Sequence, residues 1–523
     1  MARQKSEDRI KPKSRRKSVL TWGDECPGGG KAVPVNEQAS QLGLSFETAE
    51  NGGGKPTPLV GKAARDRSRA AMFAGPKSKF KEGKAMSATM EEVEKRLDEA
   101  FQSVAANKGA PGPDQQTIEQ VKASWGVLRE ELAKSLQEGT YKPGEIRRVW
   151  IPKAGGGERG LGIPNVIDRV VQEAVRRVLE PQYEPTFHPS SHGFRPNRGS
   201  HTAIEEARRH MEEGYEWVVD IDLERFFDRV HHQRLMARLA ERVEDRRLLV
   251  LISQMLKAKV VLPDGVKVST EEGVPQGGPL SPLLSNIVLD ELDAELARRG
   301  HRFVRYADDS NVYVRSERAG HRVMVSLKKF IERRLRLQVN ATKSAVARPE
   351  ERHFLGFTLR REPTDGEVEV LLSKRSEKRL ATKVIELTPR NWGSSLKASI
   401  FKVNAYLRGW LGYFGICTTG AVTVMRNTDA HIRRRLRAIQ LAHWKRKATI
   451  ATKLTKLGVS KRAAWRSIYK GRSSLWKLSH IPAVERGLRN AYFAERGLVS
   501  LADMWHARRQ PIAAPAQLML VLG

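Results

Sequence analysis

Residues 303–314 read Phe303-Val304-Arg305-Tyr306-Ala307-Asp308-Asp309-Ser310-Asn311-Val312-Tyr313-Val314. The runs at 303–306 and 311–314 are rich in aromatic and β-branched residues, and the polar residues between them favour a turn. The stretch therefore predicts a β-hairpin with Asp308 and Asp309 at its tip. Adjacent carboxylates repel one another unless a cation neutralises them. The pair indicates either a metal-binding turn or ordinary turn chemistry, in which aspartate is common.

A second acidic position follows another predicted strand. Residues 217–221 are apolar enough for a buried strand, Asp222 comes directly after them, and Phe227 follows five residues later. Mg²⁺ takes hard oxygen ligands from a few carboxylates and from substrate phosphates. Two such ions held about 3.5–4 Å apart can activate a hydroxyl and stabilise a leaving pyrophosphate in nucleotidyl transfer. The acidic positions are candidates for this chemistry.

Three further segments carry recognisable motifs. They read Gly273-Val274-Pro275-Gln276-Gly277-Gly278-Pro279-Leu280-Ser281-Pro282-Leu283-Leu284-Ser285-Asn286, Leu337-Gln338-Val339-Asn340 with Thr342-Lys343, and Phe354-Leu355-Gly356-Phe357. Together with Asp222–Asp228 and Tyr306–Asp309, they resemble the palm motifs of reverse transcriptases, in the order of that family. By this resemblance the first segment binds template and nucleotide, and the last is the primer grip. The order of the motifs favours the metal-binding interpretation of the turn.

Other segments resemble the reverse transcriptases of group II introns. They are Asn107-Lys108-Gly109-Ala110-Pro111-Gly112, Ile151-Pro152-Lys153, Arg159-Gly160-Leu161-Gly162-Ile163-Pro164 with Asp168-Arg169, and Ser191-His192-Gly193-Phe194-Arg195-Pro196. Leu407–Phe414 resembles the start of the maturase-specific thumb of that family. The resemblance covers about residues 88–508. Gly160 stands where the family usually has proline and Gln115 where it usually has glycine, which bears on local loop geometry.

The resemblance implies roles for individual residues. Asp222, Asp308 and Asp309 would hold two Mg²⁺ ions, with the backbone carbonyl of Leu223 as a further ligand. Phe227 would lie beneath the sugar and disfavour a 2′-hydroxyl; ordinary core packing is the alternative for this side chain.

The nucleotide would contact another set of residues. Lys153 and Arg159 would clamp the triphosphate, because cationic side chains bind phosphate oxygens. Gln276 and Gly277 would lie close to the incoming nucleotide, glycine permitting near approach of the backbone. Lys343 would protonate the leaving pyrophosphate or neutralise its charge.

The charge of the chain is concentrated at its C-terminal end. The 523 residues include 93 Lys and Arg against 60 Asp and Glu, a net charge of +33. Residues 91–400 hold 52 basic and 47 acidic residues, whereas residues 401–523 hold 23 and 4, together with five tryptophans. Basic side chains interleaved with aromatic ones suit a nucleic acid, and we expect binding to weaken as salt rises, chiefly through residues after 400. A basic face over an aromatic core is the alternative.

Several classes of protein are disfavoured. Only two cysteines occur, Cys26 and Cys417, so a disulfide framework and a cysteine-based zinc site are excluded. No apolar run approaches the ~20 residues of a membrane span, and no secretory signal is evident. A cytoplasmic bacterial protein associated with the nucleoid or a ribonucleoprotein is expected, without a membrane partner.

These observations together predict an α+β right-hand polymerase. We expect a disordered basic leader over 1–87, fingers and palm over 88–372, an α-helical thumb or maturase-specific region over 373–455, and a basic nucleic-acid-binding region over 456–523. The expected function is RNA-directed DNA synthesis combined with maturase activity, with group II intron RNA, target DNA, primer and dNTPs as partners. A homodimer is left open. The alternatives are a host-adapted reverse transcriptase without an intron, a non-catalytic RNA-binding maturase, and an RNA-templated RNA polymerase.

Overall fold

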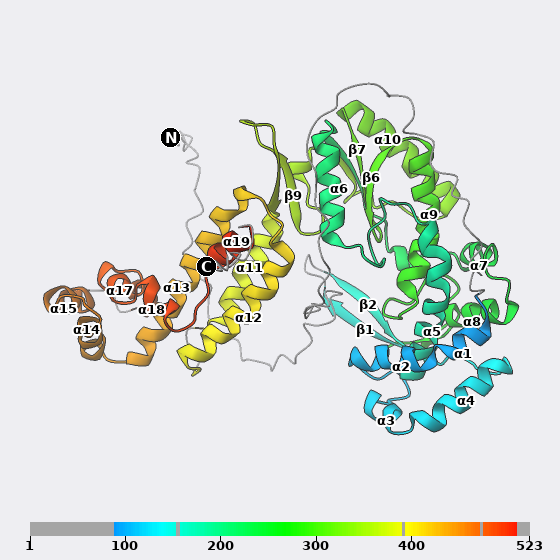
Figure 1. Cartoon of the computed structure of the whole chain (residues 1–523), viewed down its shortest axis with the longest axis horizontal. Coiled ribbons are helices and arrows are strands. Elements are labelled where there is room, and N and C mark those ends of the chain that lie inside the picture. Colours follow the sequence, from blue (N-terminus) through cyan, green and yellow to red (C-terminus); the bar gives the residue numbers. More distant parts are fainter. Residues whose placement is uncertain (1–87, 153–156, 390–392, 471–473, 510–523) are drawn as a thin grey trace, which may run out of the picture. The chain divides into compact units, whose positions relative to one another are not determined.

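The computed structural model describes residues 88–152, 157–389, 393–470 and 474–509 (Figure 1). The predicted leader at 1–87 and the candidate Lys153 lie outside the described residues. Within these ranges, no helix is long and apolar enough to cross a membrane.

The N-terminal described part is helical and carries one hairpin. From Thr89 onward, apolar residues at helical spacing predict one helix, which the structure divides at Arg96 into α1 (Met90–Lys95) and α2 (Leu97–Ala106). The predicted face is buried in both; its residues are Met90, Val93, Leu97, Ala100, Phe101 and Val104. Both contact α5 (Val166–Tyr183), which is buried along most of its length. Strands β1 (Ile146–Pro152) and β2 (Glu158–Ile163) pair in antiparallel fashion beside them. The remaining helices here are α3 (Ile118–Ala123) and α4 (Trp125–Gln137).

The two departures from the family pattern have local explanations. Gln115 adopts a φ of +58°, the left-handed conformation that glycine would take without strain. At Gly160, a Cβ atom would lie 2.5 Å from a guanidinium nitrogen of Arg148, which instead donates a hydrogen bond of 3.0 Å to the Gly160 carbonyl. The turn at Gln115 is therefore kept at a steric cost, whereas at Gly160 of β2 the arginine side chain fills the space.

The central sheet has the strand order β6-β7-β3-β8. Its strands are β3 (Trp217–Ile221), β6 (Arg302–Tyr306), β7 (Asp309–Val314) and β8 (Ala345–Ala347). Alternation of side chains gives the sheet two apolar faces. Val219, Ile221 and Phe303 belong to a core shared with α5 and α9 (Ser281–Arg298), whereas Val218 and Val304 belong to a core shared with α6 (Ser200–Glu212) and the C-terminal helices. The catalytic candidates lie where β3 ends and β7 begins.

The sequence between Leu235 and Leu256 predicts one helix, and this prediction is wrong. The structure contains α7 (His232–Ala240) and α8 (Arg246–Leu256), separated by a turn. The Asp245 carboxylate caps α8 by accepting hydrogen bonds from the backbone N–H groups of Arg247 and Leu248. The continuous apolar pattern concealed this capping residue. The other short elements of this part are β4 (Val260–Val261), β5 (Lys267–Val268), α10 (Glu317–Phe330) and the π-helical turn at Ile331–Leu335.

A hairpin leads from the sheet into a helical region. Strands β9 (Phe357–Arg361) and β10 (Val368–Leu372) are followed by α11 (Lys374–Leu387), α12 (Leu396–Phe414) and α13 (Val422–Trp444). The Tyr413 hydroxyl donates a hydrogen bond of 2.9 Å to the Leu355 carbonyl, and a ring nitrogen of His201 lies 2.6 Å from the Tyr413 carbonyl. Helix α12 therefore contacts both the predicted primer grip and α6.

The last described helices place the tryptophans in two environments. These helices are α14 (Lys447–Lys456), α15 (Lys461–Lys470), α16 (Leu475–Leu478), α17 (Pro482–Gly487), α18 (Asn490–Ala494) and α19 (Leu501–Arg509). Trp410 and Trp505 are buried, and the Trp505 indole donates to the Cys417 carbonyl at 3.1 Å. Trp465 instead stacks on the exposed Tyr469. Trp410 and Trp505 therefore fit the aromatic-core alternative.

Candidate active site

The predicted hairpin exists, but only one aspartate occupies its turn. Tyr306 pairs with Asp309, so the two-residue turn consists of Ala307 and Asp308, and Asp309 is the first residue of β7. Ala307 has a φ of +58°. The sequence placed both aspartates at the tip because their shared polarity concealed the pairing of Asp309 with Tyr306.

The register of β3 against β7 brings Asp222 to this turn. The strands are antiparallel, and Ile221 pairs with Ser310. Asp222 follows Ile221 and Asp309 precedes Ser310, so the same register sets Asp222 opposite Asp309. Asp222 is fixed through its backbone: its carbonyl accepts from Asn340 N–H at 2.9 Å, and its N–H donates to the Ser344 hydroxyl at 3.0 Å. The three carboxylates of the prediction therefore gather at one edge of the sheet.

The charge of these carboxylates is largely uncompensated. Burial, with the nearby charge of Asp222, raises the pKa of Asp308. Burial and the neighbouring charges of Asp220 and Asp308 raise the pKa of Asp309 well above its usual value. The Lys343 ammonium lies 3.5 Å from an Asp222 carboxylate oxygen, with both side chains partly exposed. A cation bound between these carboxylates would reduce the repulsion that adds to burial in raising the pKa values of Asp308 and Asp309.

These carboxylates fit a hard divalent cation whose remaining ligands come from the substrate. Among the described residues, no group of three or more His, Cys, Asp or Glu side chains is placed so that it could hold an ion by itself. Mg²⁺ commonly keeps only one or two carboxylate ligands and takes the rest from phosphates and water. Acidic side chains gathered where β3 ends and β7 begins suit this mode of binding.

Asp220 takes a structural role. Its carboxylate is paired with the Arg352 guanidinium, which also donates to the Lys343 carbonyl at 2.6 Å. This pair connects β3 to the segment before the primer grip. Strand alternation gives Asp220 a structural interpretation in the sequence, and its ion pair accounts for the residue without a metal.

A cavity of about 770 Å³ adjoins Phe227. Arg148 and Trp150 of β1 line it, together with Phe227, Asp228 and the segment Ser269–Pro275. Phe227 is half-buried, packs edge-on against Phe226, and accepts a hydrogen bond on its carbonyl from Val274 N–H at 2.6 Å. The Phe227 ring therefore forms part of the wall of this cavity, where it is available to contact a ligand.

The other residues predicted to contact the nucleotide lie in or against the β1–β2 hairpin. The Gln276 carbonyl accepts from Gly162 N–H at 2.6 Å, and a Cβ atom at Gly277 would lie 2.4 Å from the Gly162 carbonyl oxygen. The near approach that requires glycine at 277 is therefore an approach to β2. Arg159 pairs with Ile151 in the β1–β2 hairpin.

Two families match separate parts of the chain. "Reverse transcriptase (RNA-dependent DNA polymerase)" matches residues 151–359, and "Group II intron, maturase-specific domain" matches residues 377–458. Protein YkfC of Escherichia coli is 32% identical over 348 residues, which is 59% of this chain and 89% of that protein. The chain belongs to the group II intron reverse transcriptase and maturase family.

Two relatives carry intron-related names. "Group II intron-encoded protein LtrA" of Lactococcus lactis is 37% identical over 39% of this chain and 34% of its own length. "Putative COX1/OXI3 intron 2 protein" of Saccharomyces cerevisiae is 33% identical over 38% of the chain and 23% of its own length. The chain thus matches only about a third of LtrA. This chain combines the reverse transcriptase domain of an RNA-directed DNA polymerase with a group II intron maturase-specific domain, and its family uses divalent metal ions.

The sequence missed several residues that shape the site of this reverse transcriptase. Asn340 accepts the Lys343 N–H on its side-chain oxygen at 3.2 Å, which forms the turn that carries Lys343. The pair His231-His232 has no Cys or carboxylate partner at metal-ligand spacing, so the sequence predicts a surface position. His232 is instead buried, and its ring nitrogen lies 2.6 Å from the Gly273 carbonyl. Asparagine before a Thr-Lys pair was a usable turn signal. Nothing local in the sequence indicated the contact of His232.

Proposed function

We propose that this enzyme copies its group II intron RNA into DNA at a centre where Asp222, Asp308 and Asp309 hold two Mg²⁺ ions, and that it binds the same RNA to assist splicing. The observation that carries the proposal is the strand register that sets Asp222 opposite Asp309, next to the turn residue Asp308. Three neighbouring carboxylates repel one another unless a cation lies between them.

The residues of the chain prepare the site for this chemistry. When bound, the two ions would activate the primer 3′-hydroxyl and stabilise the leaving pyrophosphate. Lys343 is 62% exposed on its side chain and rests near Asp222, so it can turn toward pyrophosphate oxygens without leaving a buried position. Leu223 is held by a bridge to Val339, which fixes the backbone that would offer its carbonyl to an ion.

Phe227→Ala is expected to weaken discrimination between dNTPs and rNTPs by about 100-fold, because the ring would no longer occlude the 2′-hydroxyl. The measurement is kcat/KM for single-nucleotide addition with each sugar. Phe330→Ala, which truncates another half-buried phenylalanine that packs beneath Arg299 outside the cavity, is the matched control. Equal discrimination in wild type and Phe227→Ala would assign the ring to core packing.

The helical region is proposed to hold the nucleic acids. We infer a thumb that begins after β10, at about residue 373, and a basic region from about 456 that contacts RNA and target DNA in a ribonucleoprotein. Helix α15 supports this, since Lys461, Arg462 and Arg466 are exposed on the same helix as Tyr469. Phosphates meet such cations and unstacked bases meet such rings.

Primer extension on an RNA template with dNTPs and Mg²⁺, together with splicing of the RNA that flanks the reading frame, tests the proposal. We expect DNA product, and we expect splicing at moderate Mg²⁺ to depend on the protein. DNA synthesis without any effect on splicing would favour a host-adapted enzyme that has no intron. Absence of DNA product would contradict the proposed polymerase centre.

A further inference from the structure

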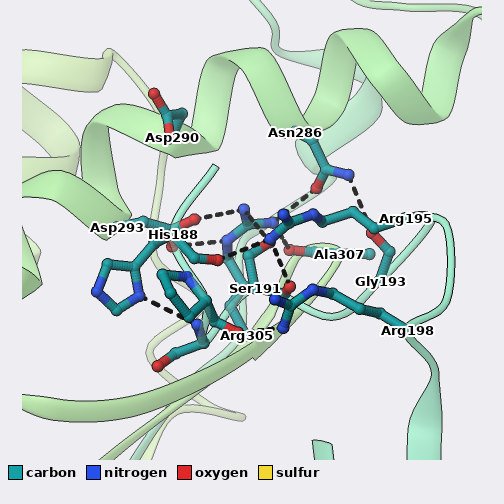
Figure 2. Close-up of polar contacts among 12 residues, drawn as sticks. His188, Ser191, Gly193, Arg195, Arg198, Asn286, Asp290, Asp293, Arg305 and Ala307 are labelled. Atoms are coloured by element: carbon teal, nitrogen blue, oxygen red, sulfur yellow. Dashed lines mark hydrogen bonds and ion pairs between the residues drawn. The ribbon is translucent and has the colours of Figure 1, made fainter. Parts of the chain in front are cut away.

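A buried ion pair lies directly behind the catalytic turn. Arg305 of β6 and Asp293 of α9 are both fully buried. The Arg305 guanidinium donates through Nε to one Asp293 carboxylate oxygen at 2.7 Å and through Nη2 to the other at 2.5 Å (Figure 2). This bidentate pair fixes the plane of the guanidinium as well as its position.

The remaining donors of Arg305 reach the turn and its neighbours. Nη1 donates to the Ala307 carbonyl at 3.0 Å and to the Asn286 side-chain oxygen at 2.9 Å, and Nη2 donates to the Ser191 hydroxyl at 2.7 Å. The Asn286 amide in turn donates to the Gly193 carbonyl at 2.9 Å. Figure 2 shows these side chains converging on Arg305 from separate segments.

The segment Ser190–Gly193 also packs against the turn through its backbone. Arg305 N–H donates to the Ser190 carbonyl at 2.9 Å, and His192 N–H donates to the Arg305 carbonyl at 2.8 Å. A Cβ atom at Gly193 would lie 2.3 Å from the Ala307 nitrogen and 2.9 Å from the Tyr306 carbonyl carbon. Only glycine allows the two backbones to lie this close.

The network around Arg305 is better explained by its effect on the geometry of the turn than by its contribution to the stability of the fold. A buried ion pair is weak evidence for stability, because well-packed apolar residues of similar volume often replace one without loss. Ala307, in contrast, holds a left-handed conformation that residues with a Cβ atom rarely adopt, and such conformations persist only where the surroundings impose them. The Arg305 donor and the Gly193 backbone are the surroundings of this residue.

We propose that Arg305, Asp293, Asn286 and the segment Ser190–Gly193 form a clamp that positions the turn Ala307–Asp308, and thereby sets the carboxylates for metal binding. The clamp members are positioning residues, since none is placed to touch substrate. The inference rests on the proposed function of Asp308. It also gives a role to the Ser191–Pro196 motif, whose function the sequence left unassigned.

Gly193→Ala tests the clamp with one added carbon. We expect kcat for dNTP addition to fall about 100-fold while KM for dNTP changes little, because a displacement near 1 Å at reacting groups has this effect. The Mg²⁺ concentration for half-maximal activity should rise, whereas the affinity for template–primer should stay within threefold. Gly199→Ala is the matched control, since no atom lies within 4 Å of a Cβ there.

The outcomes separate the two proposals. If wild type is active, Asp308→Asn is inactive and Gly193→Ala behaves like Gly199→Ala, the clamp is refuted and the metal centre stands. If Asp308→Asn is as active as wild type, the metal centre itself is refuted. Should Gly193→Ala not fold, Asn286→Ala removes the bridge between Arg305 and Gly193 from the α9 side, and the same rise in Mg²⁺ requirement is expected. An unchanged requirement in a folded Asn286→Ala would overturn the clamp.

Discussion

Asp308→Asn should reduce RNA-templated DNA synthesis by about 1,000-fold or more, because it removes an anionic ligand from a site whose chemistry depends on concentrated positive charge. Asp308 occupies the turn itself, and its pKa is raised by burial and by the charge of Asp222. The asparagine amide has nearly the same shape, removes this repulsion and binds a divalent cation less well. The folded state should therefore be retained while activity is lost.

Asp264→Asn is the control for this substitution. Asp264 is exposed on the turn between β4 and β5, where its carboxylate accepts the Val266 N–H at 3.1 Å, a bond that asparagine also makes. Rates of single dNTP addition, measured at saturating template–primer, should be unchanged in this variant. Equal rates for wild type and Asp308→Asn would show that the turn does not carry the chemistry.

Asp293→Ala should lower the free energy of unfolding by about 3–5 kcal/mol, since removing one partner leaves the other charge buried without compensation. Arg305 is fully buried and cannot reach water to recover its hydration. The effect follows from the isolated charge rather than from the intrinsic strength of the pair. Urea denaturation followed by far-ultraviolet circular dichroism measures it.

Asp290→Ala on the same helix provides the comparison. Asp290 lies outside the network of Arg305 in Figure 2, and its carboxylate is 3.5 Å from Arg238 in a partly exposed pair. Such pairs contribute about 0–1 kcal/mol. A loss of stability in Asp293→Ala no greater than in Asp290→Ala would mean that Arg305 finds other compensation.

Local sequence patterns predicted several strands of the central sheet correctly. The strand at 217–221 was predicted with its exact bounds because apolar residues ended sharply at Asp222, and the hairpin was recognised from two β-prone runs around a polar turn. The helix at 235–256 was predicted as one because residues on both sides of the turn share an apolar face. The local N-cap formed by Asp245 begins a new helix there, and a periodic apolar pattern by itself does not report such a cap.

The three-dimensional support of the site could not be predicted in the same way. Arg305 stands next to Tyr306 in the sequence, yet its partners come from two other segments: Asp293 and Asn286 from α9, and Ser191 from the segment before α6. Gly277 was explained by the nucleotide, whereas its requirement arises from the backbone of Gly162. Contacts between distant segments depend on how the sheet and helices pack, and a single sequence contains no direct signal for them.

The stoichiometry of divalent ions at the centre tests the account most directly. Mn²⁺, as a paramagnetic substitute for Mg²⁺, would be titrated into the complex of full-length protein, RNA template, chain-terminated DNA primer and dNTP, with free Mn²⁺ followed by electron paramagnetic resonance. We expect two tightly bound ions in wild type and the loss of at least one in Asp308→Asn. The same number of ions bound with the same affinity in both proteins would contradict it.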